Sequence, residues 1–106
     1  YYDVAKAAAI RMVYGLAREL AGADVACVAL APGFVRTERV AKALADDPDT
    51  LARLESPDYA GRAVVALAAD PDVMERSGRL FTVGDLARDY AFTDTDGRQP
   101  PPFRLE

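Results

Sequence analysis

The residues VACVALAPGFVRT, at positions 25–37, say most about the architecture of this chain. Residues 25–31 are all apolar and show no alternation with polar residues. A strand with this pattern is covered on both faces, as in parallel sheets that lie between helix layers. Pro32-Gly33 then interrupts regular structure. We therefore predict a buried parallel strand over residues 25–31.

Helical patterns and a second apolar run surround this strand. We expect a helix at 3–21, helices at 38–44, 57–69 and 86–90, a helical turn at 50–54 and a second strand at 79–83. A strand, a crossover helix and a further strand imply parallel pairing. Two strands alone leave the sheet edges open. Because the chain also begins at a helix entrance without an initiator methionine, we expect the 106 residues to be a fragment of a single domain.

Two of these helices have a predicted buried side. In helix 3–21 the apolar stripe consists of Ile10, Val13, Ala17 and Leu20. In helix 57–69 the residues expected to face inward are Ala60, Val64, Leu67 and Ala68. The second helix has a well-defined start, because a serine, a proline at the first helical position and a carboxylate occur in order at residues 56–58.

Composition excludes several kinds of partner. The net charge is −4, from 17 acidic and 13 basic residues without a basic run, so we expect no nucleic-acid partner. One cysteine, Cys27, and no histidine leave neither an internal disulfide nor a metal-ligand set. No apolar stretch approaches the roughly 20 residues of a membrane-spanning helix. We expect Cys27 to be a small buried residue, and this cysteine usage favours a cytoplasmic location.

Tyr2 and Lys6 are the first candidates for chemistry. They are spaced i, i+4 at the start of the first helix, so both side chains project from one face, with Cβ atoms about 6 Å apart. A lysine ammonium near a phenol favours the phenolate and lowers the phenol pKa from its usual value of about 10. Such a phenol can donate or accept a proton near neutral pH. Taken alone, the pair is a weak signal and is more typical of a solvated surface.

The order of two motifs favours the chemical interpretation. Tyr2-x-x-x-Lys6-Ala-Ala opens a helix, and the strand that follows it ends in Pro32-Gly33-x-x-x-Thr37. This arrangement resembles the short-chain dehydrogenase/reductase family, in which the tyrosine helix leads into a strand that ends in Pro-Gly. The resemblance continues through residues 56–64, 67–72, 77–78, 85–90 and 93–98, and so covers nearly all of the chain.

The resemblance implies a fold of the α/β class. The chain would be the C-terminal part of a Rossmann-type three-layer parallel sheet, with two strands plus helices present. In such sheets the ligand binds beyond the carboxyl ends of the strands, where residues 32–37 would lie. Residues 38–55 would form a mobile substrate lid. Residues 98–106, which include three successive prolines, would form an extended tail.

The resemblance also implies a catalytic site. Tyr2 would be the general acid/base that protonates the carbonyl oxygen during reduction, and Lys6 would support its phenolate and bind the nicotinamide ribose hydroxyls. The implied cofactor-binding residues are Lys6, Pro32, Gly33, Val35 and Thr37, with the backbone of 32–35 lining the nicotinamide pocket. Without the family, Pro32-Gly33 would simply end a strand. Thr37 could be only a helix cap, and we expect it to serve both purposes.

The implied cofactor is NAD or NADP, with NADP favoured. The glycine-rich phosphate loop, the catalytic serine and the residue that selects between the two cofactors do not occur in these 106 residues. We therefore expect the full-length parent to be the enzyme, acting as a homo-oligomer on a small-molecule carbonyl or alcohol. We expect the chain alone to be inactive and unstable as a monomer. The alternative hypothesis is a non-catalytic remnant that binds a partner protein.

Overall fold

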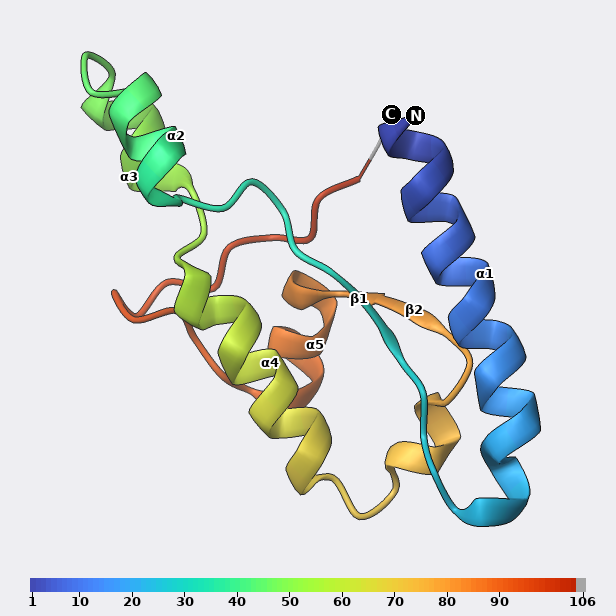
Figure 1. The fold of residues 1–106 in the computed structure, drawn as a ribbon. Coiled ribbons are helices and arrows are strands. Elements are labelled where there is room, and N and C mark those ends of the chain that lie inside the picture. Colours follow the sequence, from blue (N-terminus) through green and yellow to red (C-terminus); the bar gives the residue numbers. More distant parts are fainter. Residues whose placement is uncertain (105–106) are drawn as a thin grey trace. The chain divides into compact units, whose positions relative to one another are not determined.

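The structure is a computed structural model that describes residues 1–104, and the chain forms two compact units. The first unit contains residues 1–30 and 69–81, and the second contains residues 31–68 and the chain from residue 82 onward. Figure 1 traces the order of helices and strands through both units. No helix among the described residues is long and apolar enough to cross a membrane.

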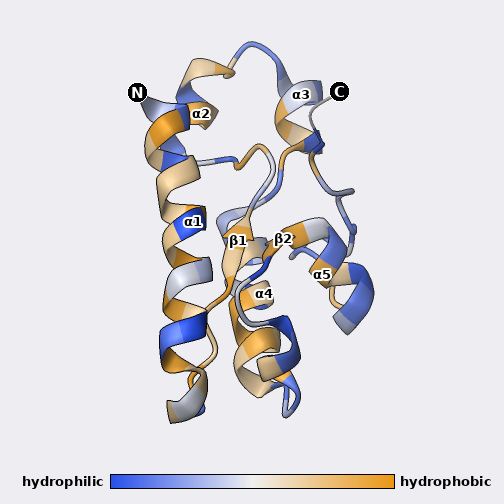
Figure 2. Ribbon diagram, turned by 90° about the vertical axis from the view of Figure 1, so that its right-hand side faces the viewer, coloured by the Kyte–Doolittle hydropathy of each residue, from blue (hydrophilic) through white to orange (hydrophobic). Residues whose placement is uncertain are grey.

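Helix α1 (Tyr2–Leu20) is the longest element of the first unit and is followed by the short 3-10 helix η1 (Ala21–Ala23). It confirms the helix predicted at 3–21 to within one residue at each end. Figure 2 shows apolar residues and charged residues interspersed along it. Ala17, from the predicted apolar stripe, is its one buried residue among those described, and it lies against Gly78 in the turn after η2 (Val73–Arg76).

Strands β1 (Ala29–Ala31) and β2 (Leu80–Thr82) pair in parallel, which confirms the predicted pairing and the α/β class. Both are shorter than the predicted strands at 25–31 and 79–83. Ahead of β1, the amide of Cys27 donates to the hydroxyl of Ser77 at 3.0 Å instead of to a strand carbonyl. The Cys27 carbonyl accepts from the amide of Gly78 at 2.7 Å. A side chain and a turn therefore replace the regular ladder there.

The second unit contains the four helices α2 (Glu38–Ala43), α3 (Pro48–Arg53), α4 (Pro57–Ala69) and α5 (Val83–Tyr90). Helix α3 begins two residues before the turn predicted at 50–54. The reason is that the Asp47 side chain accepts from the amide of Thr50 at 3.1 Å, and Pro48 occupies the first helical position.

Helices α4 and α5 form the core of the second unit. Its fully buried apolar residues are Tyr59 and Ala63 on α4 and Val83, Leu86 and Ala87 on α5. The predicted inward side of α4 was wrong for Val64, which is 56% exposed, and for Ala68, which is exposed as well, whereas Ala60 and Leu67 are half-buried. Helix α4 is apolar on more than one side, so periodicity alone could not select the side on which Tyr59 lies.

Helix α5 starts earlier than the predicted 86–90 because its first turn is capped. The Thr82 hydroxyl oxygen accepts from the amide of Asp85 at 3.1 Å, and the hydroxyl donates to the Asp85 carboxylate at 2.9 Å. The Thr82 side chain thus caps the first turn of α5, and the Asp85 carboxylate in turn binds the capping hydroxyl. Gly84 has no room for a side chain, because an added Cβ would lie 2.4 Å from the backbone nitrogen of Pro102. The chain after residue 98 thus packs directly on α5.

Candidate functional site

Tyr2 and Lys6 lie together at the start of α1. The lysine Nζ is 5.4 Å from the centroid of the tyrosine ring, as expected for side chains one helical turn apart. The ring is 74% exposed in the structure, so its hydroxyl is accessible to a ligand. The arrangement places the phenol of Tyr2 and the amine of Lys6 side by side on one helix face.

The other predicted site residues, Pro32 to Thr37, belong to the second unit and are described within it. The segment after β1 is held by an isolated parallel bridge between Val35 and Glu55. The amide of Glu55 donates to the carbonyl of Phe34 at 2.9 Å, and the Glu55 carbonyl accepts from the amide of Arg36 at 2.7 Å. This segment is therefore fixed by main-chain hydrogen bonds to the residues that precede α4.

Thr37 ends the segment as the N-cap of α2. Its Oγ1 accepts from the amide of Val40 at 3.2 Å. The predicted capping role is thus present. Capping uses the hydroxyl oxygen as an acceptor, and the same hydroxyl can still donate its hydrogen. Thr37 retains one donor for a ligand.

Glu55 is a residue of this site that sequence reasoning missed. Its side chain accepts from the amide of Gly33, with 3.0 Å between Oε2 and the nitrogen, and only 4% of the residue is exposed. An added Cβ at Gly33 would lie 2.8 Å from Oε1 of the same carboxylate. Burial raises the pKa of Glu55, the Gly33 amide lowers it, and the nearby Asp94 raises it further. The available sequence signal was a carboxylate directly before a helix start.

Asp94 anchors the other side of this segment. It is 2% exposed and accepts from the amide of Ser56 at 2.8 Å, from the Ser56 hydroxyl, and from the amide of Thr95 at 2.7 Å. Burial alone would raise the pKa of Asp94, but these hydrogen bonds outweigh burial and hold the pKa below its usual value. In addition, Arg98 donates to the carbonyl of Leu54 at 3.1 Å. The turn at 94–98 therefore fixes both neighbours of Glu55.

A cavity of about 340 Å³ opens beside Gly33 in the second unit. Phe34 and Phe103 stand edge to face at its wall, with ring centroids 5.1 Å apart. Its remaining lining residues are Arg53, Leu54, Glu55, Pro100, Pro101, Pro102 and Arg104. Arg104 also pairs with the carboxylate of Asp85 at 3.1 Å. The tail after residue 98 thus forms one side of a largely apolar cavity next to a predicted cofactor residue.

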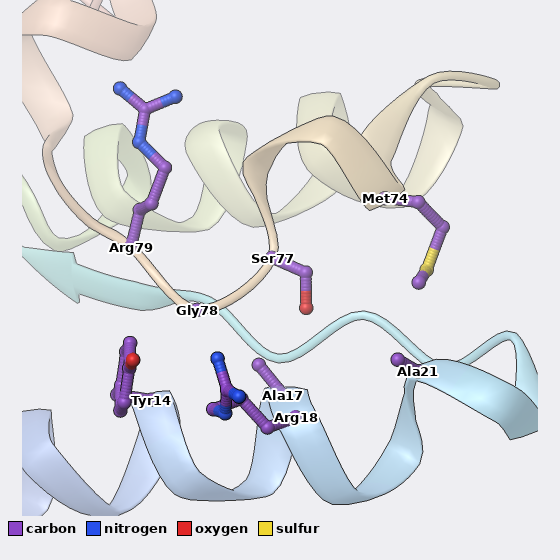
Figure 3. Close-up of a pocket in the computed structure, with 8 residues that line it drawn as sticks. All are labelled: Tyr14, Ala17, Arg18, Ala21, Met74, Ser77, Gly78 and Arg79. Carbon is purple, nitrogen blue, oxygen red and sulfur yellow. The ribbon is translucent and has the colours of Figure 1, made fainter.

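A second cavity, of about 360 Å³, lies in the first unit (Figure 3). Tyr14, Ala17 and Arg18 line it from α1 and Ala21 lines it from η1, whereas Met74, Ser77, Gly78 and Arg79 line it from the opposite segment. Arg11 and Arg18 lie over the Tyr14 ring, at 4.4 and 5.7 Å from its centroid. None of the predicted site residues lines this cavity. Tyr14 is instead engaged with these neighbouring arginines.

Tyr59 is the buried tyrosine of the described chain and has a different role from Tyr2. Its hydroxyl donates to the carbonyl of Pro100 at 3.0 Å, and its ring meets Phe92 edge to face. Burial raises the pKa of Tyr59 to about 12. A phenol that holds its proton so firmly and is fully buried has a structural role.

Among residues 1–104, no cluster of three potential metal ligands occurs.

No family model matches the chain. Curated short-chain dehydrogenase/reductases do match it, over 92% of its residues, and the chain is similar to part of these proteins. The relatives are the proteins named "Dehydrogenase/reductase SDR family member 1" of Mus musculus, 40% identical, and of Homo sapiens, 37% identical. The chain spans 34% of the length of these relatives and corresponds to their C-terminal portion.

Proposed function

We propose that the full-length protein is an NAD(P)-dependent oxidoreductase that interconverts a small-molecule carbonyl compound and its alcohol, with Tyr2 as general acid/base. The observation that supports this most directly is the Tyr2–Lys6 pair, with 5.4 Å between the ammonium nitrogen and the ring centroid. The similarity to curated short-chain dehydrogenase/reductases supports an oxidoreductase activity in general. The alternative of a non-catalytic binding module gains no support from either observation.

In this proposal Tyr2 handles the proton of the reaction. Its hydroxyl donates a proton to the carbonyl oxygen as negative charge develops there, and the phenolate takes a proton from the alcohol in the reverse direction. The ammonium of Lys6 stabilises the phenolate electrostatically. When bound, the nicotinamide ring supplies or accepts the hydride at the substrate carbon.

The residues present fit such a cofactor. Ribose hydroxyls and a carboxamide need hydrogen-bond partners, and Lys6 offers an ammonium with three donors while Thr37 keeps its hydroxyl hydrogen. The Gly33 amide is already used by Glu55. The backbone of Pro32, Gly33 and Val35 would therefore line the nicotinamide pocket by contact and through carbonyl groups. We favour NADP over NAD, and we assign the lid to residues 38–55, where α2 and α3 form two short helices.

Lys6 provides the test of this site. In the full-length protein, Lys6→Ala should raise the dissociation constant for NADPH or NADH by about 10- to 100-fold and also lower kcat, because hydrogen bonds from a charged donor contribute about 1.5–3 kcal/mol each. Cofactor binding is measured by nucleotide fluorescence, and turnover by absorbance with a panel of aldehydes and ketones. Arg88→Ala, which removes a positive charge from α5, is the control. Unchanged cofactor affinity in Lys6→Ala would refute its role.

We also propose that the full-length protein resides in the cytoplasm, where the free thiol of Cys27 would stay reduced.

We further propose that the full-length protein is a homo-oligomer that associates through α1. Met12 and Leu16 are exposed apolar residues of α1. Replacing both by glutamate should shift the protein toward monomer at micromolar concentration in sedimentation velocity, because charges would be buried in the contact. Val65→Glu on α4 adds a charge at another exposed apolar position and should leave the assembly intact. A wild-type protein that sediments as a monomer would contradict the proposal.

A further inference from the structure

Glu55 contacts the candidate cofactor segment at three successive points. Its side chain accepts from the Gly33 amide at 3.0 Å, its amide donates to the Phe34 carbonyl at 2.9 Å, and its carbonyl accepts from the Arg36 amide at 2.7 Å. A single residue thus fixes the main-chain course of residues 33–36. Of these three hydrogen bonds, only the one from the Gly33 amide to the Glu55 side chain can be changed by a substitution at position 55 that keeps the two main-chain hydrogen bonds.

Gly33 and the Glu55 carboxylate are fitted to each other. A Cβ at position 33 would meet Oε1 at 2.8 Å and Cδ at 3.3 Å, and the next nearest atom, Cβ of Phe103, lies at an ordinary 3.6 Å. The backbone conformation does not demand glycine here, since Gly33 is not among the glycines with positive φ, and a side chain at position 33 would instead have to displace the Glu55 carboxylate. The carboxylate closes over Gly33 on the side where a methyl group would otherwise point.

Glu55 is itself held in place by a rigid support. Asp94 binds the amide and the hydroxyl of the following residue, Ser56, and Arg98 binds the carbonyl of the preceding residue, Leu54. The residue is only 4% exposed, so its carboxylate has little freedom to turn toward solvent. A well-supported side chain that binds one loop amide is suited to setting the position of that loop.

We propose that Glu55 is a positioning residue, whose hydrogen bond to the Gly33 amide holds residues 33–36 in the conformation that receives the nicotinamide cofactor. This inference rests on the proposed oxidoreductase function. Glu55 would not touch the reacting atoms, because its carboxylate is buried against the backbone. Its effect is on the geometry of the pocket, where displacements near 1 Å can reduce activity about 100-fold.

Two conservative substitutions distinguish the effect of the length of the Glu55 side chain from the effect of its charge. Glu55→Gln keeps an acceptor oxygen at the same distance from the backbone and removes the charge, whereas Glu55→Asp keeps the charge and withdraws it by one methylene group. In the full-length protein, Glu55→Asp should raise the dissociation constant for NADPH or NADH by about tenfold, and Glu55→Gln should change it by less than about threefold. In hydrogen exchange of the cofactor-free protein, the Gly33 amide should lose protection only in Glu55→Asp.

Gly33→Ala supplies an independent check. Alone, it should weaken cofactor binding, because its methyl group would displace the carboxylate. Combined with Glu55→Ala, it should add little, because the two closest atoms are gone. A role confined to folding would lower the fraction of folded protein and leave the dissociation constant of the folded fraction unchanged. That result would overturn the inference, as would additive effects of the two substitutions.

The remaining outcomes are also decisive. Weak binding in Glu55→Gln with normal binding in Glu55→Asp would assign the effect to charge and overturn the inference, as would equal effects of both substitutions or none. Failure of the wild-type protein to bind NADH and NADPH would overturn the proposed function itself. Normal wild-type binding with unaffected Glu55 variants would overturn only the inference about Glu55.

Discussion

Replacing Tyr2 by phenylalanine in the full-length protein is expected to lower kcat for carbonyl reduction by about 100-fold or more, with little change in cofactor affinity. General acid catalysis by a positioned side chain contributes about 10²- to 10⁴-fold, and this substitution removes the hydroxyl alone. The ring that faces the Lys6 ammonium at 5.4 Å remains. Since the proposed ribose contacts come from Lys6 and not from Tyr2, binding of the nucleotide should survive.

The measurement compares kcat, from NADPH or NADH absorbance, with the dissociation constant from nucleotide fluorescence. Tyr14→Phe is the matched control because it deletes the same atom from the same helix. The guanidinium groups of Arg11 and Arg18 lie over the Tyr14 ring, and Tyr14 lines no cavity with the predicted site residues. Near-normal turnover of Tyr2→Phe, or an equal loss in Tyr14→Phe, would show that the proton does not pass through the Tyr2 hydroxyl.

The parts of this structure that sequence predicts well are those that depend on near neighbours. Helix α1 follows from its apolar spacing, and the approach of Lys6 to Tyr2 follows from an i, i+4 separation. Helix α4 begins where the serine–proline signal places it. Each of these features is determined within one or two turns of helix, so the pattern of residues was sufficient.

The contacts that complete the second unit join residues far apart in the chain. Gly33 and Glu55 are separated by 22 positions, and Ser56 and Asp94 by 38. No spacing rule predicts such pairs, because each depends on how the helices pack. Gly33 shows the consequence: the resemblance assigned it to the nicotinamide pocket, but the Glu55 carboxylate that accepts from its amide could be found only in the structure.

Strand lengths were overestimated for a related reason. The apolar run at 25–31 describes burial, but a strand also needs a partner in register. Ser77 and Gly78 bind Cys27 through a hydroxyl and a turn amide, so the ladder is restricted to β1 as observed. The apolar pattern could not reveal that a serine on a distant segment takes the place of a strand residue.

Asp94→Ala is expected to lower the free energy of unfolding of the full-length protein by about 3 kcal/mol at pH 7. The carboxylate is 2% exposed and accepts three hydrogen bonds, from the amide and hydroxyl of Ser56 and from the amide of Thr95. Hydrogen bonds to a charged group contribute about 1.5–3 kcal/mol each, and buried donors left without a partner add to the loss. Asp94→Asn keeps an acceptor and should be less destabilised.

The stabilisation by Asp94 should depend on pH in a defined direction. Because its pKa in the folded protein is lowered, the ionised form is favoured by folding. The contribution is therefore complete above the unfolded value of about 3.9 and is lost as the pH falls through the lower folded value. Denaturant unfolding at pH 7 and at successively lower pH should show the difference between wild type and Asp94→Ala shrinking in acid. Asp96→Ala, which alters an exposed carboxylate in the same turn, should cost far less stability at pH 7. A difference for Asp94→Ala that persisted unchanged in acid would mean that its charge does not stabilise the fold.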